Sequence, residues 1–295
     1  MVKPAWSWQF TPGHLQPVDA TALPFPISRQ WAWADSTGKG VKVAVVDSGI
    51  DPDHPRVGGV VGGAAFDHDP GAPGGVRATQ GEHADLFGHG TACAGIIRRL
   101  APDAELYSVR VLGRRLTGKG VVFAAGVRWA IEQGMQVVNL SLSTGKREYF
   151  ALFHELADLA YFRGVMLVGA VNNVPVPSYP SQYASVFSVA ANQHTDPFAI
   201  TYNPAPPVEF GAPGIDLEVA WLDGRTVTAT GNSFAAPHVT GLITRILAKH
   251  PGLTPFEVKT ILRACATNAI PVSTPTEPGW APGSDDKPVS GDSTR

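Results

Sequence analysis

Hydrophobic residues in this chain fall into two kinds of run that follow one another along the sequence. Short continuous runs rich in Val, Ile and Leu predict buried strands at residues 41–46, 105–112, 136–142, 165–170 and 186–191. Runs with helical spacing predict helices that start near Thr91, Phe123, Leu152 and Ser233. Thr254-Pro255-Phe256-Glu257 is a capping box with proline at the first helical position, and it predicts a last helix to about Ala266. Strands that alternate with helices predict an α/β fold: a doubly wound, mostly parallel sheet with helices on both faces.

The segments outside this alternation predict the limits of the folded unit. Residues 1–30 contain five prolines and little periodicity, which predicts an extended N-terminal arm. Residues 271–295 contain five Pro, three Gly and seven Ser or Thr, a composition that cannot form a core. We therefore expect one folded domain at residues 31–268 and a disordered tail at residues 269–295. Within the domain, the eight glycines of residues 57–84 predict a long loop.

The composition is that of an ordinary globular protein with one large core. Of 295 residues, 44% are hydrophobic and 16% are charged, and the formal net charge of -2 gives no reason to expect nucleic acid as a partner. No run of about 18 apolar residues predicts a membrane span, and the N-terminus lacks the apolar core of a secretory signal. The two cysteines, Cys93 and Cys265, cannot build a disulfide framework. Together these features predict a cytoplasmic protein with no membrane partner; secretion stays open as the alternative if a signal has been removed, and so does the oligomeric state.

The candidate chemistry begins with residues 231–241, G-N-S-F-A-A-P-H-V-T-G. Ser233 precedes a run with helical spacing, so we expect it at the start of a buried helix, where free backbone N–H groups and the helix dipole favour an anion. Pro237 agrees with this position, since a missing N–H costs least in the first turns of a helix. For an isolated Gly-x-Ser, an N-cap on a core helix is the ordinary interpretation, and other residues must decide.

Two more polar residues lie at the ends of predicted elements. Asp47 directly follows the first strand, so it lies at the carboxyl edge of the sheet, where such folds carry their functional groups. A carboxylate there can bind magnesium or a ribose hydroxyl, or orient a histidine, but no G-x-G-x-x-G follows the strand to support a dinucleotide site. His89 lies in F-G-H-G-T-A-C-A-G, where a glycine-rich loop gives way to a helix and small neighbours leave the imidazole accessible. Taken alone such a histidine is usually structural, and this interpretation is retained for His54 and His238.

The three motifs together resemble the catalytic blocks of the subtilisin-like serine proteases, the subtilases. V-V-D-S-G-I-D-P-D-H-P, F-G-H-G-T-A-C-A-G and G-N-S-F-A-A-P-H-V-T-G occur in the order acid, base, nucleophile, which is the order known for subtilisins. The similarity runs from about Trp31 to Ala266. It implies a subtilisin-like fold with Ser233 as nucleophile and His89 as general base and acid. Asp47 would then orient the imidazole and stabilise its cation.

The resemblance also implies a donor for the oxyanion that forms in acyl transfer. The family supplies an asparagine amide from just after a strand, and V-M-L-V-G-A-V-N-N offers Asn172 and Asn173. Ungapped alignment from Gly164 places Asn173 at that position, with Asn172 where the family usually has glycine. We therefore expect Asn173 to be the donor.

By the same resemblance, a peptide substrate adds as an extended strand to two exposed edges. These edges are Ser141-Leu142-Ser143 on one side and Leu116-Thr117-Gly118 on the other. Ser143 replaces a family glycine and is expected to narrow the primary pocket, whose floor matches Ser178. Tyr179-Pro180 is a candidate cis peptide bond.

Departures from the family pattern bear on metal binding and on regulation. Ten residues separate His89 from Leu100, which leaves no room for the calcium loop that many secreted subtilases insert there. Arg56 stands where an aspartate ligand is expected, so we predict no calcium at that site, and no cofactor. Cys93 is interpreted as a small buried hydrophobe, although the resemblance also suggests a target for mercurials. The stretch Leu23-Pro24-Phe25-Pro26 resembles the short inhibitory arm of intracellular subtilases.

The sequence thus predicts a serine endopeptidase that hydrolyses peptide bonds through an acyl-enzyme on an Asp-His-Ser triad, with a peptide or protein as its partner. Arg114 and Arg115 either favour acidic substrate residues or form a solvated turn. Transfer of the acyl group to an amine, in a protease that processes one precursor, is an alternative that needs a cleft without water. In a different class, an inactive subtilase-like domain that binds peptides would lack a triad residue, whereas all three are present here.

Overall fold

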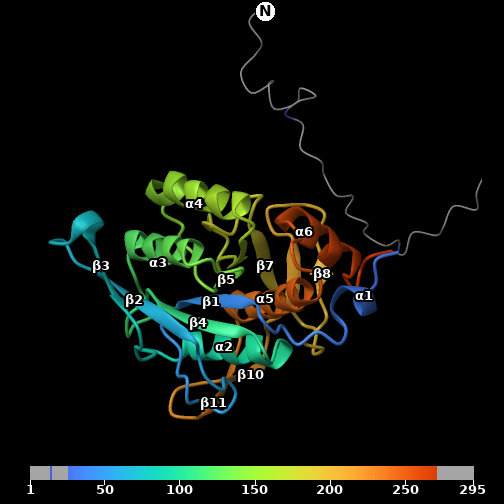
Figure 1. The fold of residues 1–295 in the computed structure, drawn as a ribbon, viewed down its shortest axis with the longest axis horizontal. Helices are drawn as coiled ribbons and strands as arrows, with labels where there is room; N and C mark the ends of the chain where they lie inside the picture. Colours follow the sequence, from blue (N-terminus) through green and yellow to red (C-terminus); the bar gives the residue numbers. More distant parts are fainter. Residues whose placement is uncertain (1–13, 15–25, 271–295) are drawn as a thin grey trace, which may run out of the picture.

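One large sheet runs through the part of the chain that the computed structural model describes, which is residue 14 and residues 26–270. Nine strands form it in the order β3-β2-β4-β1-β5-β6-β7-β9-β8 (Figure 1). They are β1 (Lys42–Asp47), β2 (Gly62–His68), β3 (Val76–Gln80), β4 (Glu105–Arg110), β5 (Val137–Leu140), β6 (Met166–Ala170), β7 (Phe187–Asn192), β8 (Thr201–Tyr202) and β9 (Phe210–Pro213). Neighbours from β2 to β9 pair in parallel, whereas β3 and β8 add antiparallel edges. The mostly parallel α/β fold is confirmed.

Helices cover both faces of this sheet, as predicted. They are α1 (Arg29–Trp33), α2 (His89–Leu100), α3 (Gly120–Glu132), α4 (Phe150–Phe162), α5 (Asn232–Lys249) and α6 (Pro255–Ala264). Because side chains alternate along a strand, Val43 and Val45 of β1 pack in one core with α1, α2, α5 and α6. Ala44 and Val46 pack in the other core with α3 and α4. Figure 1 shows α3 and α4 on one side of the sheet and α2 on the other.

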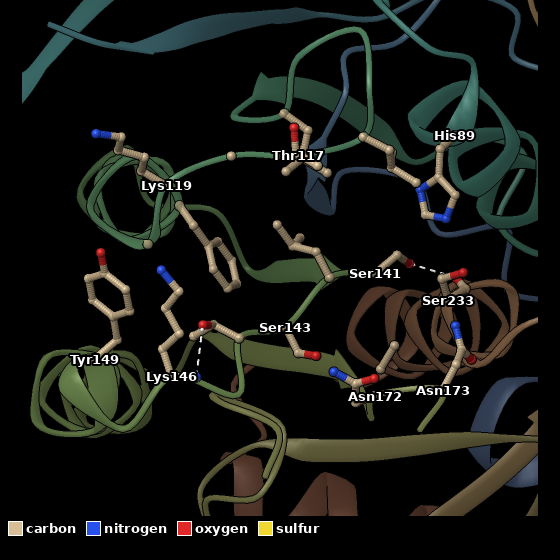
Figure 2. A pocket seen from close by; sticks show the side chains of 18 of the residues that line it. His89, Thr117, Lys119, Ser141, Ser143, Lys146, Tyr149, Asn172, Asn173 and Ser233 are labelled. Atoms are coloured by element: carbon tan, nitrogen blue, oxygen red, sulfur yellow. Dashed lines mark hydrogen bonds between the residues drawn. The ribbon is translucent and has the colours of Figure 1, made fainter. Parts of the chain in front are cut away.

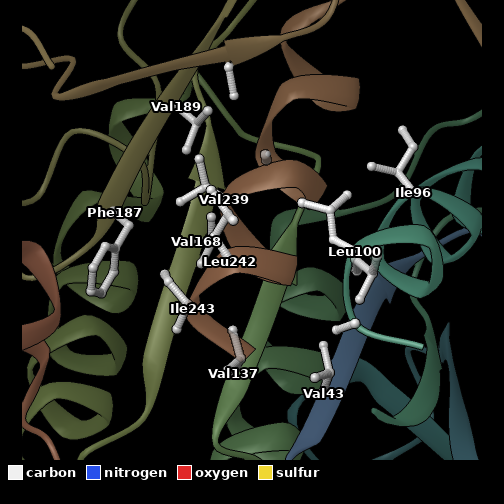
Figure 3. Close-up of a cluster of buried hydrophobic side chains, with 14 of the residues drawn as sticks. Val43, Ile96, Leu100, Val137, Val168, Phe187, Val189, Val239, Leu242 and Ile243 are labelled. Atoms are coloured by element: carbon white, nitrogen blue, oxygen red, sulfur yellow. The ribbon is translucent and has the colours of Figure 1, made fainter. Parts of the chain in front are cut away.

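Helix α5 lies at the centre of the first core (Figure 3). Its residues Val239, Leu242 and Ile243 are fully buried and face the strand residues Val137 and Val168. Helix α2 lies beside α5 and packs closely against it, because Gly241 leaves no side chain between α5 and Leu100. This arrangement holds the first turns of two helices close together at the carboxyl edge of the sheet.

The prediction of a long loop at residues 57–84 is wrong. This segment contains β2 and β3, which pair antiparallel, and a short 3-10 helix at Pro73–Gly75. Its glycines misled the prediction: a Cβ on Gly63 would lie 2.1 Å from the carbonyl oxygen of Ser108, so the missing side chain is what lets β2 pair with β4.

The other predicted strands and helices are present, with ends that differ by a few residues. The capping box at Thr254 is confirmed, and α6 ends at Ala264 rather than Ala266. Four short strands after residue 200 were not predicted, among them β10 (Leu217–Ala220) and β11 (Thr226–Ala229), which form a separate hairpin. Residues 1–13, 15–25 and 271–295 lie outside the described part, so most of the arm and tail is untested. None of the described helices is long and apolar enough to cross a membrane.

Candidate active site

Asp47 closes strand β1 and is completely buried. The imidazole of His89 donates from Nδ1 to the carboxylate of Asp47, with both oxygens at 2.9 Å. The backbone N–H of Ser48 donates to the same carboxylate at 2.8 Å. Because Nδ1 carries the shared proton, Nε2 of His89 keeps a free lone pair, which is what a general base requires.

His89 is the first residue of α2, and a close backbone contact fixes this end of the helix. A Cβ on Gly90 would lie 1.9 Å from the carbonyl oxygen of Gly49, so only glycine allows α2 to start this close to the end of β1. Burial lowers the pKa of His89, but the charge of Asp47 and the hydrogen bond to it outweigh burial, and Asp85 adds to them. The pKa of His89 is therefore raised above its ordinary value of 6.5.

A second buried carboxylate, Asp85, organises the start of α2. It accepts hydrogen bonds from the backbone N–H groups of Phe87 and Gly88, and from both the N–H and the hydroxyl of Thr91. The hydroxyl of Ser48 donates to Asp85 at 2.8 Å and accepts from the Gly90 N–H at 3.1 Å. Sequence reasoning missed Asp85, although an aspartate just before a helix is an ordinary capping signal.

Ser233 lies in the first turn of α5, as predicted, and a buried chain of polar groups fixes that turn. Its carbonyl oxygen accepts from the hydroxyl of Ser141 at 2.7 Å. Asn139 donates to that hydroxyl at 2.9 Å and accepts from Thr240 of α5 at 3.0 Å. Asn139 was also missed, and its signal was a polar residue inside the strand run V-V-N-L. Ser233 and His89 line the same pocket, and no hydrogen bond joins them among the described residues.

The two candidate asparagines differ in where their amide nitrogens point. Asn173 Oδ1 accepts from the backbone N–H of Asn232 at 2.9 Å, which leaves Nδ2 free to donate, and Figure 2 shows that nitrogen directed toward Ser233. Asn172 Oδ1 accepts from the N–H of Val174 at 3.1 Å, and its nitrogen points toward Ser143 instead. The geometry thus places Asn173, the predicted donor, beside the serine.

The pocket around these residues is a cleft of about 550 Å³. Both predicted edges line it: Leu116, Thr117 and Gly118 on one side, and Ser141, Leu142 and Ser143 on the other. In Figure 2 the serine, the histidine and Asn173 lie at one end, and Lys119, Lys146 and Tyr149 lie at the other. Within the described part of the chain, the lining includes these two lysines and no carboxylate.

Ser178 does not line the cleft. It is buried behind Asn172, whose N–H donates to its hydroxyl at 2.9 Å. The Tyr179–Pro180 peptide bond is cis, as predicted. Arg114 and Arg115 are exposed and lie outside the cleft lining, next to Leu116.

One group of described residues combines three potential metal-ligand atoms: Asp47, His89 and Cys93, within 4.8 Å of one another. A metal there would have to displace the hydrogen bond between His89 and Asp47. Burial raises the pKa of the Cys93 thiol well above its ordinary value, with a contribution from the charge of Asp47, so a thiolate ligand is disfavoured. Cys93 and Cys265 are both buried and unpaired.

Comparisons with known proteins show the family of this chain. The model of the subtilase family matches residues 38–281. The chain belongs to the subtilase family. Subtilisin Savinase of Lederbergia lenta is 35% identical over 264 residues, which cover 84% of this chain and 93% of that protein. An alkaline protease of Alkalihalobacillus alcalophilus is also 35% identical over 264 residues, and the match spans 66% of its length, slightly under two thirds.

A solved structure extends the similarity to the fold of this subtilase. The crystal structure of a cold adapted subtilisin-like serine proteinase matches with a TM-score of 0.65 and 26% identity, covering 78% of this chain and 84% of that one. The subtilisin-like fold implied by the three motifs is therefore confirmed.

Proposed function

We propose that this subtilase is a serine endopeptidase that hydrolyses peptide bonds through an acyl-enzyme. The observation that carries the proposal is the buried Asp47–His89 pair, which leaves His89 Nε2 free in the cleft that Ser233 also lines. Ser233 is the nucleophile, His89 the general base and acid, and Asp47 the group that orients the imidazole and stabilises its cation.

In the first half of the reaction, Ser233 Oγ attacks the carbonyl carbon of the substrate and passes its proton to His89 Nε2. Negative charge develops on the carbonyl oxygen, where Asn173 Nδ2 and the backbone N–H of Ser233 stabilise it; the N–H groups of Asn232 and Phe234 on either side are already bonded. Collapse of this intermediate breaks the C–N bond, and His89 gives the proton to the departing amine. Water then repeats the sequence on the acyl-enzyme and releases the acid.

The hydrogen bond between Ser233 and His89 forms in this scheme when substrate fills the cleft. Catalytic hydrogen bonds are often long or poorly aligned in a free enzyme and tighten in the substrate complex. Peptide substrate adds as an extended strand between Leu116-Thr117-Gly118 and Ser141-Leu142-Ser143, whose positions along the cleft support this binding mode. Ser178 supports the loop that carries Asn172 rather than touching substrate.

A fluorophosphonate probe tests the function directly. Such a probe forms a phosphonyl ester, with loss of fluoride, only with a serine that is activated as a nucleophile, so we expect covalent labelling at Ser233 and none in Ser233→Ala. Asp47→Asn is the matched control, because it keeps the shape of the carboxylate and slows turnover about 10⁴-fold in triad proteases. An unlabelled but folded wild-type protein would favour the alternative class, an inactive peptide-binding domain. An added amine nucleophile that captures the acyl group as the main product would favour transfer over hydrolysis.

We also propose a cytoplasmic location, which the two unpaired cysteines support. Recovery of the protein mainly from the culture medium would contradict it.

The catalytic unit was expected at residues 31–268. Helix α1 begins at Arg29 and packs against the end of α5, where Trp31 stacks on His250 at 4.1 Å. We therefore propose that the unit starts at or before Arg29, with limited proteolysis as the test.

A further inference from the structure

A second cavity lies between α2, β10 and α5. Its volume is about 490 Å³, close to that of the catalytic cleft. Figure 1 shows the β10–β11 hairpin beneath α2. The cavity is lined by three arginines, one glutamate and one histidine besides apolar residues: Arg56, Arg98, Arg99, Glu218 and His238. None of these residues takes part in the proposed reaction.

His238 presents an unused hydrogen-bond acceptor to this cavity. Its side chain lies on α5 and the residue is 4% exposed. Nδ1 donates to the carbonyl oxygen of Phe234 at 2.9 Å, so Nε2 carries the lone pair, and no described residue donates to it. Among the described residues, Trp129 Nε1 is the one side-chain polar atom sealed from solvent without a partner. His238 Nε2 is therefore not sealed, and the space it reaches is the cavity that it lines.

His238 stays neutral at physiological pH, so Nε2 remains an acceptor. Burial lowers the pKa of His238, the hydrogen bond to Phe234 opposes this effect, and the charge of Arg99 adds to it, so that the pKa is about 4. A bound molecule therefore satisfies Nε2 by donating a hydrogen bond to it from an O–H or N–H group.

Among the residues that the structure describes, the lining of the cavity also includes one cation without a fixed partner. Arg98 is committed to structure, since it donates to the backbone carbonyl oxygens of Val57, Pro102 and Ala104, and to that of Gly59. Arg56 is paired with the carboxylate of Glu218. Arg99 is exposed and makes no ion pair or hydrogen bond within the described part of the chain. Its guanidinium is available to an oxyanion.

We propose that this cavity binds a small oxyanion that carries a hydroxyl group or an acidic proton, of which hydrogen phosphate is the simplest example. Arg99 binds the charged oxygens, and the proton-bearing oxygen donates to His238 Nε2. A fully ionised anion such as sulfate can bind Arg99 equally well. Sulfate has no O–H group, however, so its oxygen lone pairs would face the lone pair of His238 Nε2 without a hydrogen bond. The site therefore distinguishes hydrogen phosphate from sulfate by the proton that the anion carries, not by the size or shape of the anion.

A ligand held this way bridges α2 and α5, the helices that begin with His89 and carry Ser233. Binding to the folded state alone raises the midpoint of thermal unfolding in a saturable way. This stabilisation does not require protease activity. The proposal of an anion site and the proposal of protease activity can therefore be disproved independently of each other.

The test compares low millimolar inorganic phosphate with sulfate at pH 7 and matched ionic strength, using the complete protein. We expect phosphate to raise the unfolding midpoint by about 3–6 °C at roughly ten times its Kd, and sulfate to have little effect. Arg99→Gln should abolish the phosphate shift. Arg128→Gln removes the same charge from an exposed position on α3, away from the cavity, and should retain the shift. Equal stabilisation by both anions, no phosphate shift in the wild type, or a full phosphate shift in Arg99→Gln would each overturn the proposal.

Discussion

At the scale of single residues, the site depends on which atoms are already committed to a partner. The amide oxygen of Asn173 is occupied by the N–H of Asn232, so the side chain cannot flip without losing a hydrogen bond, and its nitrogen stays directed at Ser233. Nδ1 of His89 is likewise committed to Asp47. In both cases a partner far along the chain sets the orientation of the reacting group before substrate arrives.

Asn173→Ala should therefore lower kcat far more than it raises KM. Loss of one oxyanion donor costs about 2.7–4 kcal/mol of transition-state stabilisation in subtilisin, which corresponds to roughly 10²–10³ in kcat. Steady-state kinetics on a peptide substrate measures the effect. Asn172→Ala is the matched control and should change kcat much less; the reverse order would assign the oxyanion to Asn172.

The raised pKa of His89 sets the acid side of the pH profile. His89 accepts a proton only when neutral, and a raised pKa keeps the imidazole protonated to higher pH, so activity falls as the pH drops through that value. We expect the acid limb of kcat/KM, measured with an uncharged peptide, to have its midpoint above 6.5. A midpoint below 6.5 would mean that burial outweighs Asp47.

The sequence was informative at this scale where a residue stands in a local motif. Asp47, His89 and Ser233 each follow a pattern that a few neighbours define; His89 and Ser233 line one cleft, and Asp47 is buried behind His89. Asp85 has a local capping signal that was overlooked, since it accepts from Phe87, Gly88 and Thr91. Its bond to Ser48, 37 positions away, and the bond of Asn139 to Thr240, 101 positions away, belong to no local pattern. Ser178 shows the converse, since its motif predicted the pocket floor while its hydroxyl is used by the Asn172 backbone.

At the scale of elements, the contact between α2 and α5 controls how His89 and Ser233 approach each other. A Cβ on Gly241 of α5 would lie 2.7 Å from Cβ of Leu100 on α2, closer than two such carbons can come. The contact involves Cβ atoms, which are fixed to the backbone. A side chain added at Gly241 therefore cannot be accommodated by a change of rotamer and has to displace one of the helices.

Gly241→Val should separate the two helices and reduce both stability and activity. Overpacking of this kind costs about 1–3 kcal/mol, and the unfolding midpoint should fall by several degrees, with kcat/KM falling as the histidine and serine move apart. Thermal unfolding and kinetics on the same preparation measure both effects. Gly62→Val is the control, because a Cβ there meets its nearest neighbour at an ordinary 3.7 Å; equal losses in the two variants would contradict the role of the helix contact.

Elements were predictable from the sequence where one pattern dominates. The central strands are continuous apolar runs because both of their faces are covered by helices, and they were found. Strand β2 was missed because its pairing with β4 needs Gly63, and glycine counts as a loop signal until the neighbouring strand is known. The short strands β8 to β11 have two to four residues each, too few for a period to emerge.

At the scale of the whole molecule, an ion pair occupies the position where the resemblance to subtilases led us to expect an aspartate ligand for calcium. Arg56 is paired with Glu218, and this bond joins the loop after β1 to strand β10. Helix α2 runs unbroken from His89 to Leu100 and leads to β4 through residues 101–104. A divalent cation at this place would meet the guanidinium of Arg56 instead of an oxygen ligand.

Chelation should therefore leave stability unchanged. We expect the same unfolding midpoint, within experimental error, with and without millimolar EDTA, and no gain on adding calcium in excess. Differential scanning calorimetry measures both. A midpoint that drops with EDTA and recovers with calcium would show that a cation binds and stabilises the fold.

The central position of α5 has a consequence for how the protein is inactivated by heat. From Phe234 to Thr244 every residue of this helix is buried, so its amides can exchange with solvent deuterium only when the surrounding layers come apart. The nucleophile is thus attached to a segment that we expect to open only when the whole fold opens. Gradual local fraying will therefore spare Ser233 itself, and its reactivity toward a small probe should vanish together with the entire fold in one cooperative event.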